Sequence, residues 1–200
     1  MKVRTHVKLA QLAFDSNSVK IPKGFSKFMF NFGLVMIDQS WHVKTHPHYM
    51  QKSFDYITKK IDELSLIDQF NGYYSMQLGI VVHYLCDFCC YAHITGSIGN
   101  VRFHLDYERK IQKYLLENYQ VLLNKLNKSN LSANVSDIKS SLVRVLEEYK
   151  NGSHSYFWDI QKCTEASYIL CYNIFNIVSL NSSNTLDITL DYQSNKYQTY

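Results

Sequence analysis

The 200-residue sequence predicts an all-α protein, a compact bundle of several helices in a single domain. Two observations predict this class. The chain contains only two prolines and seven glycines, so long segments run without a helix breaker. Within those segments apolar residues recur at intervals of three and four, the period of an amphipathic helix. Hydrophobic residues make up 46% of the chain, which is enough for one core and leaves little room for a second domain.

The apolar spacing predicts seven helices, at about residues 3–14, 24–37, 47–66, 72–94, 101–127, 134–150 and 154–180. Turn signals separate them: Asn71-Gly72 before the fourth helix, a glycine-containing stretch at 96–100 after it, and a polar stretch at 127–134 before the sixth. We expect residues 1–180 to form the domain and residues 181–200 a polar C-terminal tail, either frayed or with a short strand at 186–190.

Composition excludes several classes of protein. The net charge of +4 is mild and forms no basic stripe for nucleic acid, although it suits a phosphate-bearing substrate. Five cysteines are an odd number, and three of them lie in one apolar run, so a disulfide framework is not expected. No apolar run approaches the roughly 20 residues of a membrane-spanning helix. The first residues lack a signal-peptide pattern, so we expect a cytoplasmic protein.

The predicted fourth helix carries ionisable residues on an apolar background. His83 and Asp87 are four residues apart, so their side chains project from one side of the helix. Burying an imidazole and a carboxylate without partners costs about several kcal/mol of folding free energy. A hydrogen-bonded core pair or a divalent cation would supply the compensation.

Three further residues favour the cation. His93 ends the same predicted helix, and the next helix opens with His104 and Glu108, again four apart. Imidazole nitrogens and carboxylate oxygens are ligands that zinc accepts. Two such clusters on neighbouring helices would lie close together, as in two-metal phosphotransfer sites.

The pattern His83-x3-Asp87-x5-His93, a short loop and His104-x3-Glu108 resembles the zinc-dependent phospholipase C family, and S1/P1-type nucleases have a similar pattern. The resemblance implies a helical bundle of the phospholipase C and P1 nuclease type. It also implies that His83 and Asp87 bind one zinc ion, that Asp87 bridges to another, and that His93, His104 and Glu108 bind a separate ion.

The same resemblance assigns residues upstream. Asp38 would be both a ligand of the first zinc and the acid that orients or deprotonates the attacking water. A histidine from the cluster of His42, His46 and His48 would complete that site. We prefer His48, because it stands just before the amphipathic residues 53–57, which resemble the start of the family's next helix. His46 is a close rival, and an ordinary solvated loop is the alternative.

His6 resembles an early histidine that shares a zinc ion with the bridging acid and with the terminal amine of the chain. Secreted family members begin with a tryptophan, whereas this sequence begins with Met1 and Lys2. Three readings remain open: the Met1 amine completes this site, the site is incomplete, or another cleavage forms the terminus.

We therefore expect a hydrolase of phosphoric esters with two to three zinc ions, in which a metal-activated water attacks phosphorus in line. The expected substrate is a phospholipid head group or another phosphodiester, with peripheral membrane contact as an option. Two alternatives stay open. One is a single-strand nuclease or nucleotidase, for which nucleic acid is a substrate only; the other is a non-catalytic, metal-stabilised helical module.

Overall fold

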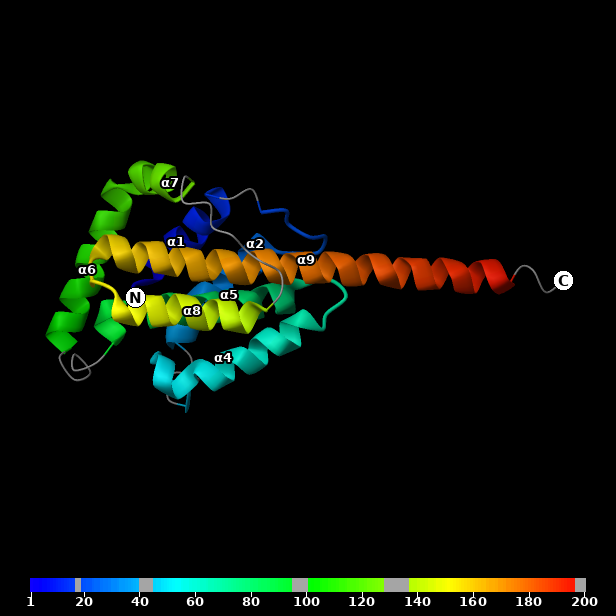
Figure 1. Cartoon of the computed structure of the whole chain (residues 1–200), viewed down its shortest axis with the longest axis horizontal. Coiled ribbons are helices and arrows are strands. Elements are labelled where there is room, and N and C mark those ends of the chain that lie inside the picture. The colour runs from blue at the N-terminus through cyan, green and yellow to red at the C-terminus, as the bar shows by residue number, and fades with distance from the viewer. Residues whose placement is uncertain (17–18, 40–44, 95–100, 128–136, 197–200) are drawn as a thin grey trace.

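Two long helices, α5 (Gly72–Phe88) and α9 (Tyr156–Lys196), form the centre of the computed structural model (Figure 1). The structure describes residues 1–16, 19–39, 45–94, 101–127 and 137–196, with side chains as far as Ser182. Within these ranges it contains α-helices, two short 3-10 helices and no strand, which confirms the all-α prediction. The remaining elements are α1 (Val3–Asp15), α2 (Lys27–Met36), η1 (Ile37–Gln39), α4 (Met50–Ser65), η2 (Tyr91–His93), α6 (Val101–Glu117), α7 (Tyr119–Asn127) and α8 (Ile138–Asn151).

Helix α5 lies inside the protein because helices cover it on several sides. It contacts α2, α4 and α9, and nearly every residue from Leu78 to Phe88 is buried. An apolar helix without a polar face has to be enclosed in this way. Its polar residues therefore sit deep in the molecule. Figure 1 shows α6 standing upright across the end of the bundle where the N-terminus lies.

Several predicted helices differ at their ends from the observed ones. The helix expected at 72–94 ends at Phe88, and the chain then forms η2. The helix expected at 101–127 is divided at Asn118 into α6 and α7, where the Asn118 amide donates to the Tyr114 carbonyl oxygen (2.9 Å). Such side-chain bonds to the backbone compete with regular helix geometry.

Of the two alternatives for the C-terminal residues, the short strand at 186–190 is wrong, because α9 continues as a helix to Lys196. This stretch contains neither proline nor glycine, and adding a residue to an existing helix costs far less than starting one. The helix passes position 180 without a break. Residues 186–190 therefore stay helical despite their alternating apolar pattern, because they extend a long helix. The division into a domain at 1–180 and a tail stays a prediction.

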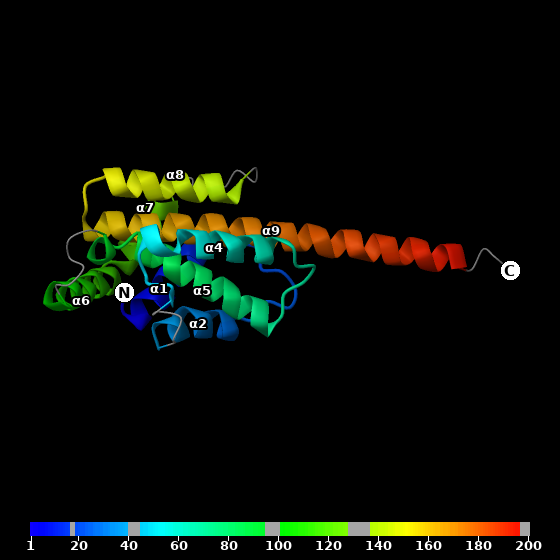
Figure 2. The ribbon, with the colours of Figure 1, turned by 90° about the horizontal axis from the view of Figure 1, so that it is seen from below.

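Two glycines allow α2 to lie directly on α5. A Cβ atom added at Gly33 would lie 2.1 Å from the Met76 carbonyl oxygen, and one added at Gly79 would lie 2.1 Å from the Phe30 carbonyl oxygen. The two backbones are thus in contact at these positions. Figure 2 shows α2 lying alongside α5. This close crossing brings the main chain of α2 within reach of the polar residues of α5.

None of the helices in the described ranges combines the length and the apolar character that a membrane span requires. All five cysteines are free and buried, so they belong to the core as small apolar side chains.

We predict that Gly33→Ala and Gly79→Ala each lower the free energy of unfolding, because a methyl group at either position meets backbone that cannot rotate away. Overpacking of this kind costs about 1–3 kcal/mol. Urea unfolding followed by circular dichroism measures the loss. Gly72→Ala is the matched control, since its nearest contact is the flexible Met29 side chain at 3.3 Å. Equal urea midpoints for Gly33→Ala and Gly72→Ala would show that the crossing is not tight.

Candidate metal centre

Two clusters of ionisable side chains lie at the end of α5. In each cluster one ligand atom per residue lies within 4.8 Å of all the others. The first cluster consists of Asp38, His48, His83 and Asp87, and the second consists of His93, His104 and Glu108. The structure therefore brings together seven residues that the sequence singles out.

Asp87 lies between the two clusters and is fully buried. Its Oδ2 faces the first cluster, 2.8 Å from His48 Nδ1 and 3.1 Å from His83 Nε2. Its Oδ1 faces the second cluster, 3.5 Å from His93 Nε2. Burial favours the protonated acid, but His93 and its cationic neighbours outweigh burial and hold the pKa of Asp87 well below its usual range. Asp87 is thus an anion that both clusters share.

The close crossing of α2 and α5 fixes the orientation of the His83 ring. Its Nδ1 lies 2.8 Å from the Leu34 carbonyl oxygen, which can only accept a hydrogen bond. Nδ1 therefore carries the proton and donates it, and Nε2 faces Asp87 and Asp38. Buried donors or acceptors that fix a ring in this way are typical of metal-binding histidines.

His104 of the second cluster is also held by a backbone carbonyl oxygen. Its Nδ1 lies 3.3 Å from the Ala92 carbonyl oxygen, and its Nε2 lies 2.7 Å from Glu108 Oε1. Each cluster thus contains a histidine whose outer nitrogen is occupied by backbone and whose inner nitrogen points at a carboxylate.

The turn before α4 selects His48 among the three upstream histidines. Ser53 Oγ donates to the Pro47 carbonyl oxygen (2.6 Å) and Tyr84 Oη donates to the His46 carbonyl oxygen (2.6 Å), which together hold the chain on either side of this point. The His48 ring turns inward to Asp87, whereas the His46 ring stacks on Tyr56 with a centroid distance of 3.9 Å. His42 lies outside the described residues.

His6 and the amine of Met1 lie beside the shared acid. His6 Nε2 is 3.4 Å from Asp87 Oδ1, and its ring stacks on His83 at 3.8 Å between centroids. The Met1 nitrogen is 2.7 Å from Asp87 Oδ1 and 3.1 Å from Glu108 Oε1. Burial lowers the pKa of His6 well below its usual value, so the ring is neutral and offers a lone pair.

Excess negative charge marks this site. Asp38, Asp87 and Glu108 converge on it, and their charge must be balanced from nearby. Burial opposes protonation of His83, but Asp87 and Asp38 raise the pKa of His83 to about 9. Burial likewise opposes the charge on the Met1 amine, and Asp87 together with Glu108 raises its pKa to about 12. Protons on these groups occupy the place that a bound cation would take, since metal binding releases protons from its ligands.

Unpaired polar atoms test whether zinc fits. Buried atoms without a hydrogen-bond partner include His6 Nε2 and Asp87 Oδ2, which lie at the clusters. His48 Nε2 and His93 Nδ1 also lack a partner, but the other nitrogen of each ring faces Asp87. Each such atom costs about 1–3 kcal/mol when nothing binds it. Although His48 Nδ1 approaches Asp87 Oδ2 to 2.8 Å, that oxygen accepts no hydrogen bond. Polar groups that approach closely without hydrogen bonding to each other are arranged to bind a common ion. Imidazole nitrogens and carboxylate oxygens form a ligand set that zinc accepts.

A buried acid that the sequence analysis missed holds the second cluster in place. Asp159 of α9 accepts hydrogen bonds from the Tyr91 backbone N–H (3.0 Å), Tyr107 Oη (2.8 Å) and Tyr149 Oη (2.9 Å). Tyr91 begins the short helix that ends with His93, and Tyr107 precedes Glu108. Burial raises the pKa of Asp159 to about 6, against the effect of the three donors. An acid within an apolar stretch of a predicted helix was the signal available.

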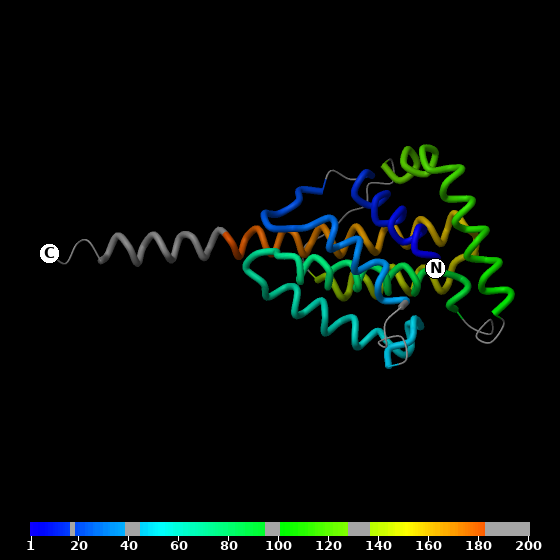
Figure 3. Tube along the Cα trace, turned by 180° about the vertical axis from the view of Figure 1, so that it is seen from behind, coloured from blue at the N-terminus to red at the C-terminus, as the bar shows by residue number. Residues whose placement is uncertain are grey.

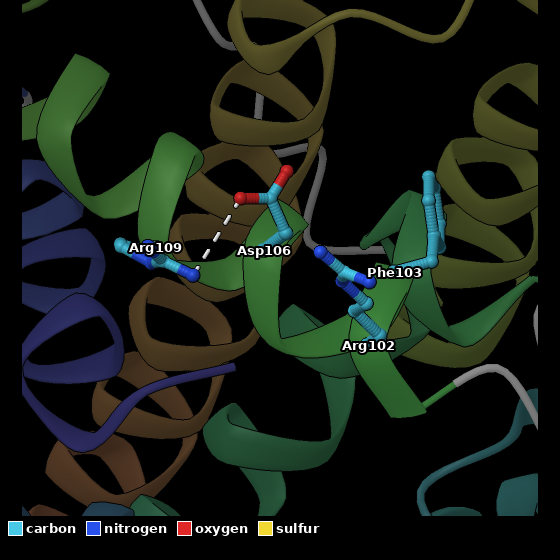
Figure 4. Close-up of a pocket in the computed structure, with 4 residues that line it drawn as sticks. All are labelled: Arg102, Phe103, Asp106 and Arg109. Atoms are coloured by element: carbon cyan, nitrogen blue, oxygen red, sulfur yellow. Dashed lines mark ion pairs between the residues drawn. The ribbon is translucent and has the colours of Figure 1, made fainter.

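A surface pocket on α6 is separate from the clusters. Figure 4 shows it lined by Arg102, Phe103, Asp106 and Arg109, with Asp106 paired to Arg109 at 3.6 Å. Asp106 lies two residues from both His104 and Glu108, about 200° around the helix axis. The pocket therefore opens on the other side of α6.

Comparison with known proteins agrees with the geometry of the clusters. The family described as zinc dependent phospholipase C matches residues 5–156, about three quarters of the chain, and this range includes all eight side chains that the sequence assigns to zinc, from His6 to Glu108. Neither curated proteins nor solved structures gave a significant match. The chain belongs to the zinc-dependent phospholipase C family, and it is a zinc-dependent phosphodiester hydrolase.

Proposed function

We propose that the protein is a phospholipase C that cleaves phosphocholine-type head groups at a centre of two to three zinc ions. The observation that carries the proposal is the position of Asp87, whose two oxygens face two separate sets of nitrogen and oxygen ligands. Bound zinc supplies Lewis acidity, which acidifies water and withdraws charge from phosphate oxygens. The cytoplasmic location stays a prediction.

The ligand sets follow from the clusters. The first ion would be held by Asp38, His48, His83 and Asp87, and the second by His93, His104 and Glu108. A third ion would use His6, the other side of Asp87 and the amine of Met1. Support for the third comes from the unpaired nitrogens of His6 and from the 2.7 Å separation of the Met1 nitrogen from Asp87 Oδ1.

Asp38 is the residue best suited to accept a proton from the attacking water. Its side chain is 30% exposed, whereas the side chains of His83 and Asp87 are fully buried. Asp38 Oδ1 lies 3.3 Å from His83 Nε2, so one end of this carboxylate touches the cluster while the group still reaches solvent. A proton taken up here can pass to bulk water, as general base catalysis requires. The buried carboxylate of Asp87 has no such path and serves as a shared ligand.

We predict that Asp87→Asn removes the zinc ions that Asp87 would hold, those of the first cluster and of the His6 site, and lowers hydrolysis more than about a hundredfold, because a neutral amide cannot balance the cations. Elemental analysis of the purified protein counts the ions, and circular dichroism checks the fold. Glu108→Gln should empty the second cluster alone.

Asp106→Asn is the matched control for this pair of variants. Asp106 lies on the same helix as Glu108 but faces the pocket of Figure 4, so zinc content and activity should equal those of the wild type. An Asp87→Asn protein that keeps its full zinc content and activity would refute the assignment of this residue.

The substrate is tested directly with the zinc-loaded protein. We expect turnover of a chromogenic phosphocholine ester and none of single-stranded DNA, with Asp38→Asn abolishing turnover while retaining most of the zinc. Cleavage of the DNA alone would favour the nuclease alternative. Zinc without turnover of either compound would favour the non-catalytic module.

A further inference from the structure

The outer side of α2 carries an exposed apolar stripe. Phe28, Phe32 and Met36 follow one another at intervals of four, which places them in a row along one side of the helix. Their exposed fractions are 77%, 40% and 37%, and Ile21 in the preceding loop is 52% exposed. Figure 2 shows α2 along the lower edge of the bundle, with no other described helix beneath it. Figure 3, from behind, shows the same helix facing the viewer.

Basic residues accompany the stripe. Lys20, Lys23 and Lys27 are exposed and form no ion pair among the described residues. Residues 16–37 contain these three lysines and no acidic residue. These exposed residues, here called the α2 face, are apolar or basic, and none of them is acidic: Lys20, Ile21, Lys23, Lys27, Phe28, Phe32 and Met36.

The α2 face leads directly to the metal centre. Met36 ends α2, and Asp38 follows two residues later in η1. The opposite side of the same helix rests on α5 through Gly33, and its Leu34 carbonyl oxygen accepts the hydrogen bond from His83 Nδ1. One short helix thus connects an exposed apolar surface to the most exposed acid of the first cluster.

We propose that the α2 face docks on an anionic lipid surface and presents lipid substrate to the site beside Asp38. The combination of aromatic or aliphatic side chains with lysines is typical of segments that lie in the interface of a membrane, where apolar burial and attraction to anionic lipid add together. A second copy of the chain fits poorly, because a symmetric contact would place the lysines against one another. The use of the face in catalysis rests on the proposed phospholipase activity, whereas its binding to lipid does not.

Sedimentation with vesicles tests the binding. The full-length, zinc-loaded protein is mixed with vesicles of phosphatidylcholine alone or of phosphatidylcholine with phosphatidylglycerol. We expect tighter binding to the mixed vesicles and weaker binding as salt is raised. Each lysine near such a surface contributes about fivefold, so combined Lys20→Glu, Lys23→Glu and Lys27→Glu should weaken binding about a hundredfold or more. Phe28→Ser should also weaken it.

Matched controls separate the α2 face from general charge and apolarity. Combined Lys59→Glu, Lys113→Glu and Lys150→Glu changes the net charge equally on other helices. Leu66→Ser removes an apolar side chain that is 81% exposed outside the α2 face. Both controls should bind vesicles like the wild type. Equal losses in the controls and in the α2 variants would overturn the proposal.

Activity distinguishes failure of this proposal from failure of the proposed function. Phe28→Ser should cleave a soluble phosphocholine ester like the wild type and lose cleavage of vesicle lipid. If the wild-type protein binds vesicles but cleaves neither substrate, the docking proposal is supported and the proposed phospholipase activity is refuted. Wild-type protein that cleaves the soluble ester but does not bind mixed vesicles overturns the docking surface. A dimer that Phe28→Ser dissociates, without vesicle binding, would overturn it in favour of a second copy.

Discussion

The structure depends on the burial of one carboxylate, that of Asp87, at the inner end of an apolar helix. A buried charge is tolerated only when its surroundings compensate it. Here the compensation comes from five directions: His6 and the Met1 amine at the start of the chain, His48 before α4, His83 on the same helix and His93 after it. Segments that are far apart in the sequence are held together because each of them supplies a partner to the same anion.

The local parts of this arrangement could be predicted from the sequence. Intervals of four residues place His83 beside Asp87 and His104 beside Glu108 whatever the rest of the fold does, since the geometry of one helix turn decides it. The all-α class follows in the same way from apolar periodicity. Asp38 and His48 needed the likeness to a known family, because their distance from α5 depends on how helices cross.

Other features of the structure could not be predicted from the sequence, for physical reasons. The crossing of α2 on α5 depends on two glycines that look unremarkable along the chain and matter only once the backbones meet. The bonds of Asp159 to Tyr91, Tyr107 and Tyr149 join three separate elements, so no spacing rule connects them. The continuation of α9 to Lys196 reflects attachment to a long helix and overrides a strand-like pattern in its last turns.

The hydrogen bond that orients His83 comes from a main-chain oxygen, and every amino acid has one. Replacing Leu34 therefore changes the packing of α2 but leaves the acceptor chemically intact. The orientation of the ring is lost only if the helix itself moves away. The orientation of His83 is therefore less sensitive to substitution of Leu34 than to substitution of Gly33 or Gly79. These two glycines make no contact with the metal centre, yet they set the separation of the two backbones.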